Sequence, residues 1–138
     1  MSARFWIFFG AVFGGLAVVA GAIGAHALPD AAALAVPLRI YNTGQLYHAL
    51  HALAMIGAGL AMLYVEGKQS GFSKWLLQIA ALAFTIGIVC FSGGIYVQVA
   101  KGFTSSAGIV PAGGIAFIIG WVAFAAGALG LRDSPEGT

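Results

Sequence analysis

Charged residues are scarce in this sequence of 138 residues: they make up 7% of it, whereas a typical soluble domain carries about 25%. Hydrophobic residues account for 61% of the chain, which excludes a soluble enzyme fold. The net charge of +2 arises from six Lys and Arg residues against four Asp and Glu residues, without a basic cluster that follows a phosphate backbone. Nucleic acid is therefore excluded as a partner.

Cysteine is nearly absent. The single residue, Cys90, excludes both an intrachain disulfide framework and a zinc or iron–sulfur site built from the cysteines of one chain. We expect Cys90 to be a buried, unreactive thiol. The zinc-protease pattern HExxH is also missing, and no Asp or Glu lies inside the long apolar runs. We therefore expect no catalytic residues, no metal and no cofactor.

Uncharged runs fill most of the chain, at residues 5–29, 40–65, 75–100 and 102–131. Each exceeds the roughly 20 residues that cross a hydrocarbon core about 30 Å thick. Backbone amides inside a bilayer must be paired within their own segment, and the period-2 alternation of barrel strands is absent. The sequence therefore predicts an all-α, four-helix integral membrane bundle. It forms one polytopic domain over 1–138, with spans at about 5–27, 40–65, 75–100 and 109–131.

The positive residues between the runs predict the orientation. Four of them lie on one side of the membrane, namely Arg4, Lys68, Lys74 and Arg132. Only Arg39 and Lys101 lie on the other side. Because positive residues are retained inside, both termini are expected to be cytoplasmic. The first run imitates a signal peptide, but it is longer than the roughly 7 to 15 apolar residues of such a peptide, so we interpret it as a retained span.

Glycine is abundant, with 21 residues, about twice the usual share of roughly 7%. In the first and last runs it recurs at helical spacing, at Gly14, Gly21, Gly113, Gly120 and Gly127. Such stripes let two helices approach closely in a bilayer. Two interpretations stay open: packing inside the bundle, or a surface for another copy of the chain or another integral membrane protein.

The second run begins with an unusual polar load for a bilayer segment. Depth arithmetic at about 1.5 Å per residue places one group of polar side chains in the outer half of the bundle. This group, the polar cluster, consists of His26, Tyr47, His48, His51, Ser92 and Tyr96. We expect Ser92 to bond back to the carbonyl of Ile88. Trp121 does not fit an interfacial belt and is expected to pack against a neighbour.

Three roles are open for the polar cluster. A hydrogen-bond network that ties the helices together is the first, with His51 as a structural residue. A metal or haem site is the second, because His48 and His51 share a helix face and His26 offers a third ligand. A vestibule for protons or a small solute is the third, since ionisable residues inside a membrane are functional candidates.

These residues resemble a family of small membrane proteins known as domain of unknown function 423, which includes the transmembrane protein 256 group. The motifs lie in order along nearly the whole chain: Gly21-Ala22-Ile23-Gly24-Ala25-His26, Thr43-Gly44 with Tyr47 and His51-Ala52-Leu53, Phe91-Ser92-Gly93 with Tyr96, Pro111-Ala112-Gly113-Gly114, and Gly120-Trp121. The resemblance implies a four-span protein of bacterial inner membranes or related organelle membranes, without an established catalytic activity. His26 and His51 fall on the family's pattern, whereas His48 is an additional histidine and Gly94 replaces a more usual serine.

The leading functional hypothesis is a non-enzymatic membrane protein that acts through helix association, with itself or as an accessory subunit of a larger membrane complex. The glycine-rich faces and the scarcity of reactive groups support it. Passage of protons or a small solute through the outer-half vestibule is the alternative, and metal or haem binding by the histidines is a further one.

Overall fold

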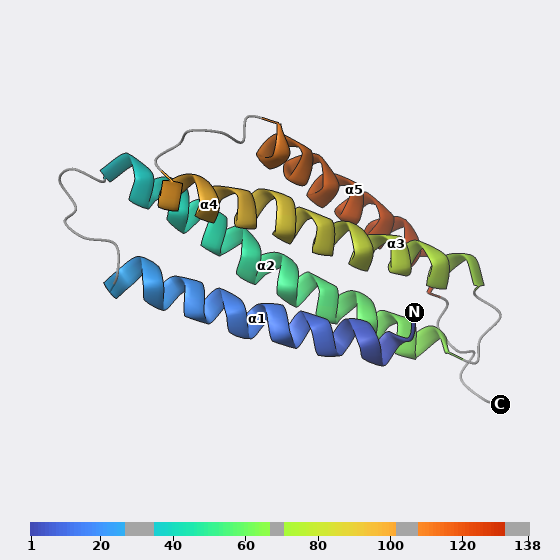
Figure 1. Ribbon diagram of the computed structural model, residues 1–138. Coiled ribbons are helices and arrows are strands. Elements are labelled where there is room, and N and C mark those ends of the chain that lie inside the picture. Colours follow the sequence, from blue (N-terminus) through green and yellow to red (C-terminus); the bar gives the residue numbers. More distant parts are fainter. Residues whose placement is uncertain (27–34, 67–70, 102–107, 132–138) are drawn as a thin grey trace, which may run out of the picture.

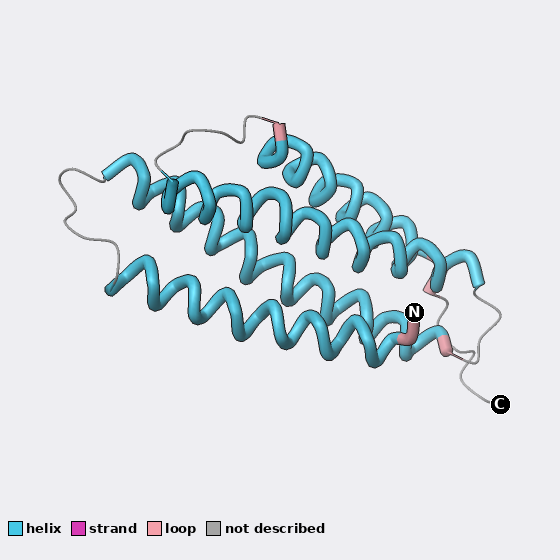
Figure 2. The backbone as a smooth tube through the Cα atoms, in the orientation of Figure 1, coloured by secondary structure: helices cyan, strands magenta, loops and turns pink. Residues whose placement is uncertain are grey.

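Helices account for the whole architecture in the part of the chain that the computed structural model describes, residues 1–26, 35–66, 71–101 and 108–131 (Figure 2). Their order is α1 (Ala3–His26), α2 (Ala35–Val65), α3 (Gly71–Gly87), η1 (Ile88–Ser92), α4 (Gly93–Lys101) and α5 (Ile109–Leu129). The short element η1 is a π-helical turn that joins α3 to α4, so these three elements form one continuous span.

Four helical segments are long and apolar enough to cross a membrane: Ala3–His26, Leu38–Val65, Gly71–Lys101 and Ile109–Leu129. The predicted fold class, all-α with four helices that are each long and apolar enough to span a membrane, is thereby confirmed. Boundaries follow composition because the uncharged stretches supply all the apolar length that a bilayer helix needs.

The spans run antiparallel, and they pack as two pairs. Helix α1 packs along α2, and α5 packs along α3 and η1. Contacts between α2 and α3 join the pairs, so α1 and α5 lie on the outside (Figure 1). In the most apolar stretch of α1 only 22% of the residues are buried, against 50% in α2. The outer helices therefore present most of their circumference to the bilayer.

The seam between α1 and α2 recurs along α1 at spacings of three, four or seven residues, at Ala3, Trp6, Gly10, Ala17, Ala20 and Gly24. A Cβ atom on Gly10 would lie 2.6 Å from Ile56 and 3.0 Å from the carbonyl oxygen of Ala52. On the partner helix, a Cβ atom on Gly59 would lie 2.7 Å from Ile7. Glycine is therefore what allows these two backbones to touch.

The seam between α3 and α5 uses the glycines predicted for the last span. A Cβ atom on Gly120 would lie 2.6 Å from the ring of Phe84, and one on Gly127 would lie 3.0 Å from Leu77. A Cβ atom on Gly113 would meet the backbone of η1 at Phe91. These three glycines therefore lie against α3 and η1 inside the bundle.

The glycines of α1 divide differently. A Cβ atom on Gly14 would meet nothing within 4 Å, whereas one on Gly21 would lie 3.4 Å from the side-chain amide of Gln45. Gly14 thus stands beside the internal seam rather than in it. The residues that bring α1 against α2 are Gly10 and Gly24. Each lies about one helical turn from a predicted glycine, Gly14 or Gly21.

The interior is apolar at the end of the bundle where α1 begins. Met55, Ala58, Met62, Leu77 and Ala81 have no solvent exposure there. A second apolar cluster follows along the bundle and centres on Phe84 and Phe117. The polar side chains in the first half of α2 lie beyond the first of these layers, toward the other end of the bundle.

Substituting Gly120 by Ala tests the seam between α3 and α5. The added methyl group overlaps the fully buried ring of Phe84, and overpacking of this kind costs about 1 to 3 kcal/mol. We expect Gly120→Ala to lower the free energy of unfolding by that amount, measured by denaturant titration in mixed micelles. The matched control is Gly14→Ala, which should leave stability unchanged or raise it, because its methyl group enters open space. Equal effects of the two substitutions would contradict the seam.

Candidate functional site

His51 lies at the centre of the polar site, on the middle of α2, and is 2% exposed. Its Nε2 atom lies 3.1 Å from Nε1 of Trp121 on α5, and its Nδ1 atom lies 2.7 Å from the carbonyl oxygen of Tyr47. An indole N–H only donates, so Nε2 accepts and Nδ1–H donates to the carbonyl. Both ring nitrogens are thereby paired, and the imidazole is fixed in one neutral tautomer.

Aromatic rings enclose this imidazole. It stacks on Phe117 with 3.5 Å between ring centroids and an interplanar angle of 14°. Phe84 packs at 5.5 Å from the imidazole and at 5.3 Å from Trp121. The imidazole therefore joins α2 to α5 across a distance of 70 residues in the sequence, at a point where these two helices otherwise have few contacts.

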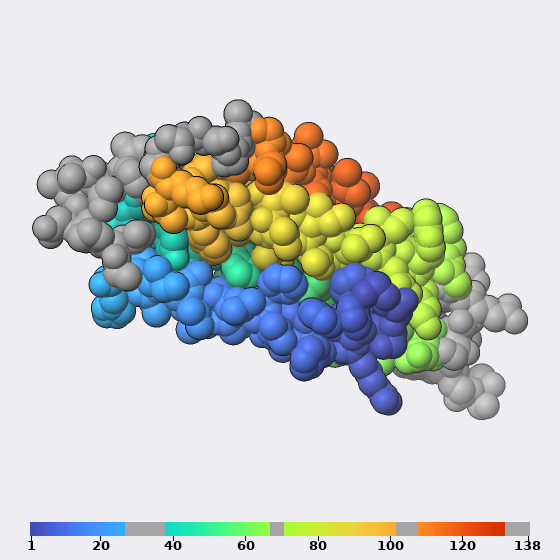
Figure 3. All heavy atoms as spheres, in the orientation of Figure 1, coloured from blue at the N-terminus to red at the C-terminus, as the bar shows by residue number. Residues whose placement is uncertain are grey.

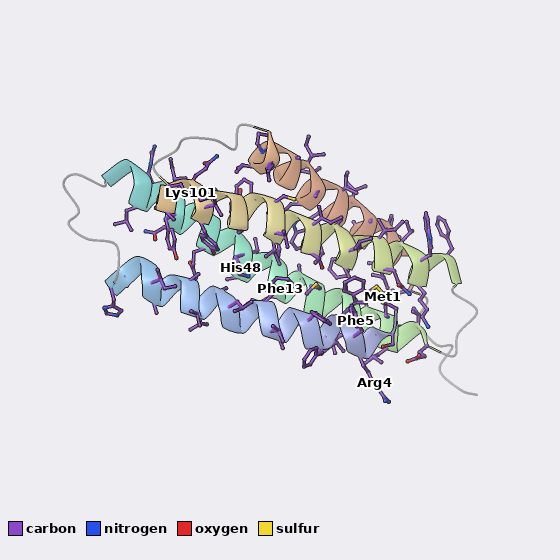
Figure 4. The ribbon with its side chains drawn as sticks, in the orientation of Figure 1. Met1, Arg4, Phe5, Phe13, His48 and Lys101 are labelled. Atoms are coloured by element: carbon purple, nitrogen blue, oxygen red, sulfur yellow. The ribbon has the colours of Figure 1, made fainter. Side chains whose placement is uncertain are left out.

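His48 stands one turn before His51 and faces a different neighbour. Its Nδ1 atom shares a hydrogen bond of 3.2 Å with the hydroxyl of Tyr96 on α4. Its ring meets Phe13 of α1 edge to face at 5.9 Å, and Figure 4 shows these two side chains between α1 and α2. His48 is 5% exposed, and within the described part of the chain its Nε2 atom has no hydrogen-bond partner.

A cavity of about 400 Å³ lies next to His48. Its walls come from α1, α2 and α4, and Tyr41, His48 and Tyr96 are its polar members. The hydroxyl of Tyr41 donates to the carbonyl oxygen of Ala20 at 2.7 Å, and the rings of Tyr41 and Tyr96 lie 5.0 Å apart. His48 and Tyr41 line this cavity while their side chains stay almost fully buried.

Ser92 ends the π-helical turn and has no exposed surface. The expected hydrogen bond from its hydroxyl to the carbonyl of Ile88 is wrong. In the π-helical turn, that carbonyl accepts the backbone N–H of Gly93. The hydroxyl has no partner among the described residues. The next residue back, Phe91, lies between Tyr47 at 5.0 Å and Phe117 at 5.7 Å, so the turn carries part of the aromatic enclosure.

His26 does not join the others. It is the exposed last residue of α1, and Gly24, two positions earlier, lies against Tyr41 of α2. Tyr41 precedes His51 by ten residues, which corresponds to about 15 Å along a helix. The expectation that His26 converges with His51 is therefore wrong, because α2 extends further in that direction than the depth arithmetic assumes.

The structure brings together four of the predicted residues in two pairs, Tyr47 with His51 and His48 with Tyr96. Cys90 lies nearby and is half-buried rather than buried. Three partners are missing from the predicted polar cluster. The first is Trp121, which the sequence marks only as a poor fit to an interfacial belt. Its indole N–H donates a hydrogen bond to Nε2 of His51.

Tyr41 and Gln45 are the other two partners. The side-chain amide of Gln45 donates to the carbonyl of Ala17 at 3.2 Å, as Tyr41 does to Ala20. Both carbonyls belong to α1, so these side chains bind one helix to the backbone of the next. Two features of the sequence could have indicated these bonds to α1: the polar residues at the start of the second run, and the small residues of the first run, which leave its carbonyls accessible.

The site offers little to a metal ion. Any metal bound at His51 would displace either Trp121 or the carbonyl of Tyr47. His48 has one nitrogen that is not already paired. Within the described residues, no three His, Cys, Asp or Glu side chains gather into a ligand set. What the arrangement supplies instead is a fixed aromatic enclosure, and beside it a cavity with hydrogen-bonding groups on one wall.

The fold and this site define a small multi-pass membrane protein with an internal histidine–aromatic network. Residues 20–114 match the family described as protein of unknown function DUF423, and the chain belongs to this family. It is 33% identical over 132 residues to the UPF0382 inner membrane protein YgdD of Escherichia coli K12, covering 96% of this chain and 95% of that protein. It is 34% identical over 123 residues to the UPF0382 membrane protein YwdK of Bacillus subtilis, covering 86% and 91%. No solved structure is a significant match.

The bond between Trp121 and His51 is testable by a double-mutant cycle. Trp121→Phe keeps an aromatic ring but leaves Nε2 of His51 buried without its donor, so we expect the free energy of unfolding to fall by about 1 to 3 kcal/mol. Adding His51→Phe to that variant should cost less than the same change in the wild type, because the bond is already lost. Trp75→Phe, at an exposed position, is the control. Additive effects would argue against the bond.

Proposed function

We propose that this protein is a non-enzymatic membrane protein that acts by helix association in the plane of the bilayer, through the outward face of α1. The observation that carries the proposal is the open space at Gly14 and Gly15, where added Cβ atoms would meet nothing within 4 Å. A glycine that faces lipid weakens a helix by about 1 kcal/mol relative to alanine and contributes no packing. Two such residues in mid-span suit a contact with another helix.

The surrounding residues support this face. Gly14 borders one side of α1, three residues after Ala11 and four before Val18. Spacings of four and three place five residues on that side, at Ala11, Gly15, Val18, Ala22 and Ala25. We call these five residues the small-residue face. All five are exposed, and α1 forms the lower edge of the molecule in the space-filling view (Figure 3).

Helix α5 is a poorer candidate for the contact. Its glycines at Gly113, Gly120 and Gly127 are buried against α3 and η1. Its exposed side chains include Ile115 and Ile118, whose bulk keeps a second helix further away. Of the two spans considered from the sequence, α1 therefore has the stronger support.

A second copy of the chain is the simplest occupant of the small-residue face, because closed two-fold contacts use one self-complementary surface. A larger membrane complex that the chain joins as an accessory subunit is the other occupant considered. The inner membrane is the proposed location, supported by the name of the relative from Escherichia coli.

The absence of enzymatic activity is proposed from the described side chains. Both nitrogens of His51 are engaged in hydrogen bonds, and the spans contain no carboxylate to orient a histidine for general-base chemistry. Ser92 has no histidine bonded to its hydroxyl among the residues that the structure describes. The polar groups are placed to hold helices together.

Passage of protons or a small solute is less well supported. The cavity beside His48 is the vestibule that such a function needs. Further along the bundle, however, Met55, Met62 and Leu77 are fully buried in an apolar layer. Moving an unpaired polar group through such a layer is costly, and the hydroxyl of Thr85 beside Met55 is already bonded to the carbonyl of Ala81.

Disulfide cross-linking tests the association. In a background with Cys90→Ala, we expect Val18→Cys to form a cross-linked dimer in native membranes, because Val18 is 72% exposed on the small-residue face. Ile118→Cys, 65% exposed on α5, is the matched control and should stay uncross-linked. Adding Gly15→Leu should reduce the Val18 dimer without changing thermal unfolding, since nothing lies near Gly15. A heavier cross-linked product that contains another protein would identify that protein, rather than a second copy, as the occupant of the small-residue face. Equal cross-linking at both positions, or at neither, would refute the role of α1.

The orientation is a separate part of the proposal: the end of the bundle where α1 begins faces the cytoplasm. The four-to-two bias of positive residues supports it. In the same Cys90→Ala background, we expect a membrane-impermeant maleimide added outside to label Lys101→Cys and to spare Glu66→Cys. These positions lie at the ends of α4 and α2, at opposite ends of the bundle (Figure 1). The reverse labelling pattern would invert the topology.

A further inference from the structure

The cavity beside His48 has the shape of a small-molecule site that opens toward lipid. Its volume of about 400 Å³ lies in the range of roughly 300 to 1,000 Å³ that is common for such sites. Leu16, Val19 and Ile23 form its α1 wall, and each of these side chains is about half exposed. They lie on a different side of α1 from the small-residue face, so binding in the cavity is independent of the proposed association.

The opposite wall holds an incompletely paired polar group. His48 and Tyr96 share one hydrogen bond, and two tautomers of the neutral imidazole are compatible with it. If Tyr96 donates to Nδ1, the N–H at Nε2 stays buried without an acceptor. If Nδ1–H donates to Tyr96, the phenol hydrogen is left free at the cavity wall. Either way, the pair has one hydrogen more than the described residues can accept.

A ligand oxygen resolves this imbalance. When it accepts the phenol hydrogen of Tyr96, the pair adopts the second tautomer, in which both hydrogens have an acceptor and Nε2 of His48 is an unprotonated nitrogen without a donor. A buried donor without a partner is unfavourable, and binding of such a ligand removes that penalty. Tyr41 does not compete for the ligand as a donor, because its own hydrogen is committed to Ala20.

Depth limits the kind of molecule that supplies this oxygen. His48 lies ten residues from Leu38, the start of the span, which corresponds to about 15 Å along the helix. A span of 28 residues is about 42 Å long, and the hydrocarbon core is about 30 Å thick, so His48 lies inside the hydrocarbon region. The ester carbonyls of phospholipids stay at the boundary of that region. The ligand must therefore be uncharged, soluble in hydrocarbon and able to carry a carbonyl oxygen to that depth.

We propose that the cavity between α1 and α4 binds the ring of a quinone-type lipid, with one ring carbonyl accepting the hydroxyl hydrogen of Tyr96 and His48 holding that hydroxyl in place. The ring enters from the bilayer between Val19 and the α4 wall and lies beside the aromatic faces of Tyr41 and Tyr96. The isoprenoid tail stays in the lipid. Binding alone is proposed.

The test uses the full chain in nanodiscs of phosphatidylcholine and phosphatidylglycerol, with a decyl-substituted benzoquinone as the probe and native mass spectrometry as the measurement. We expect saturable binding of one quinone per chain. Tyr96→Phe should weaken it about five- to tenfold, the effect of one lost hydrogen bond. Val19→Phe should abolish it by filling the entrance, while every polar group stays in place. Tyr47→Phe removes a hydroxyl from the same helix as His48 outside the cavity and should bind as the wild type does.

A second readout separates binding from a merely structural role. In ¹⁵N NMR spectra the probe should shift His48 to the tautomer protonated at Nδ1, and this shift should be absent in Val19→Phe. Retention of phospholipid at the site with no displacement by the quinone would overturn the proposal. Binding that is unchanged in both Tyr96→Phe and Val19→Phe would overturn it as well. Neither outcome bears on cross-linking at Val18, so the proposed association stands or falls separately.

Discussion

Close backbone contact at glycine is the constraint on which this structure depends. In a bilayer, an apolar side chain gains little by leaving lipid for protein, so helices are held by dispersion at short range and by polar bonds. Gly10 and Gly59 bring α1 against α2, and Gly120 and Gly127 bring α5 against α3. Each pair is dense because one helix presents a hole where the other presents a large side chain. Two helix pairs follow directly from this packing, and contacts between α2 and α3 join them.

Polar bonds then fix how the pairs are arranged. The bond from Trp121 to His51 connects the α3–α5 pair to α2, and the rings of Phe117 and Phe84 pack against its two partners. Glycine also serves the polar groups. Gly21 leaves room for the side chain of Gln45 to reach the carbonyl of Ala17. Small residues and polar residues therefore act together at this end of the bundle: the first permit the approach, and the second make it specific.

The sequence predicts four apolar helices and the common face of the α5 glycines, because both depend on composition and on spacing within one helix. Predictions from the sequence are wrong where the contacts of a residue depend on the position of a neighbouring helix. The pair Gly14 and Gly21 fits a helical stripe as well as Gly10 and Gly24 do, and only the position of α2 distinguishes the two registers. His26 is misplaced by depth arithmetic because the relative heights of two helices are not encoded in either one. The expected bond from Ser92 to Ile88 is absent at a π-helical turn, in which the carbonyl of Ile88 accepts the backbone N–H of Gly93, five residues ahead.

The two ends of the bundle differ in a way that bears on function. At the end where α1 begins, Met55, Met62 and Leu77 fill the interior with apolar atoms. At the other end lie the histidine pairs, the bonds from Tyr41 to α1, and the cavity beside His48. A polar solute that reached the cavity would meet the apolar layer next. The cavity opens sideways, past α1 side chains that are half exposed to lipid. Such an arrangement favours holding a hydrophobic molecule over conducting a hydrophilic one, because the apolar layer that stabilises the bundle also blocks passage through it.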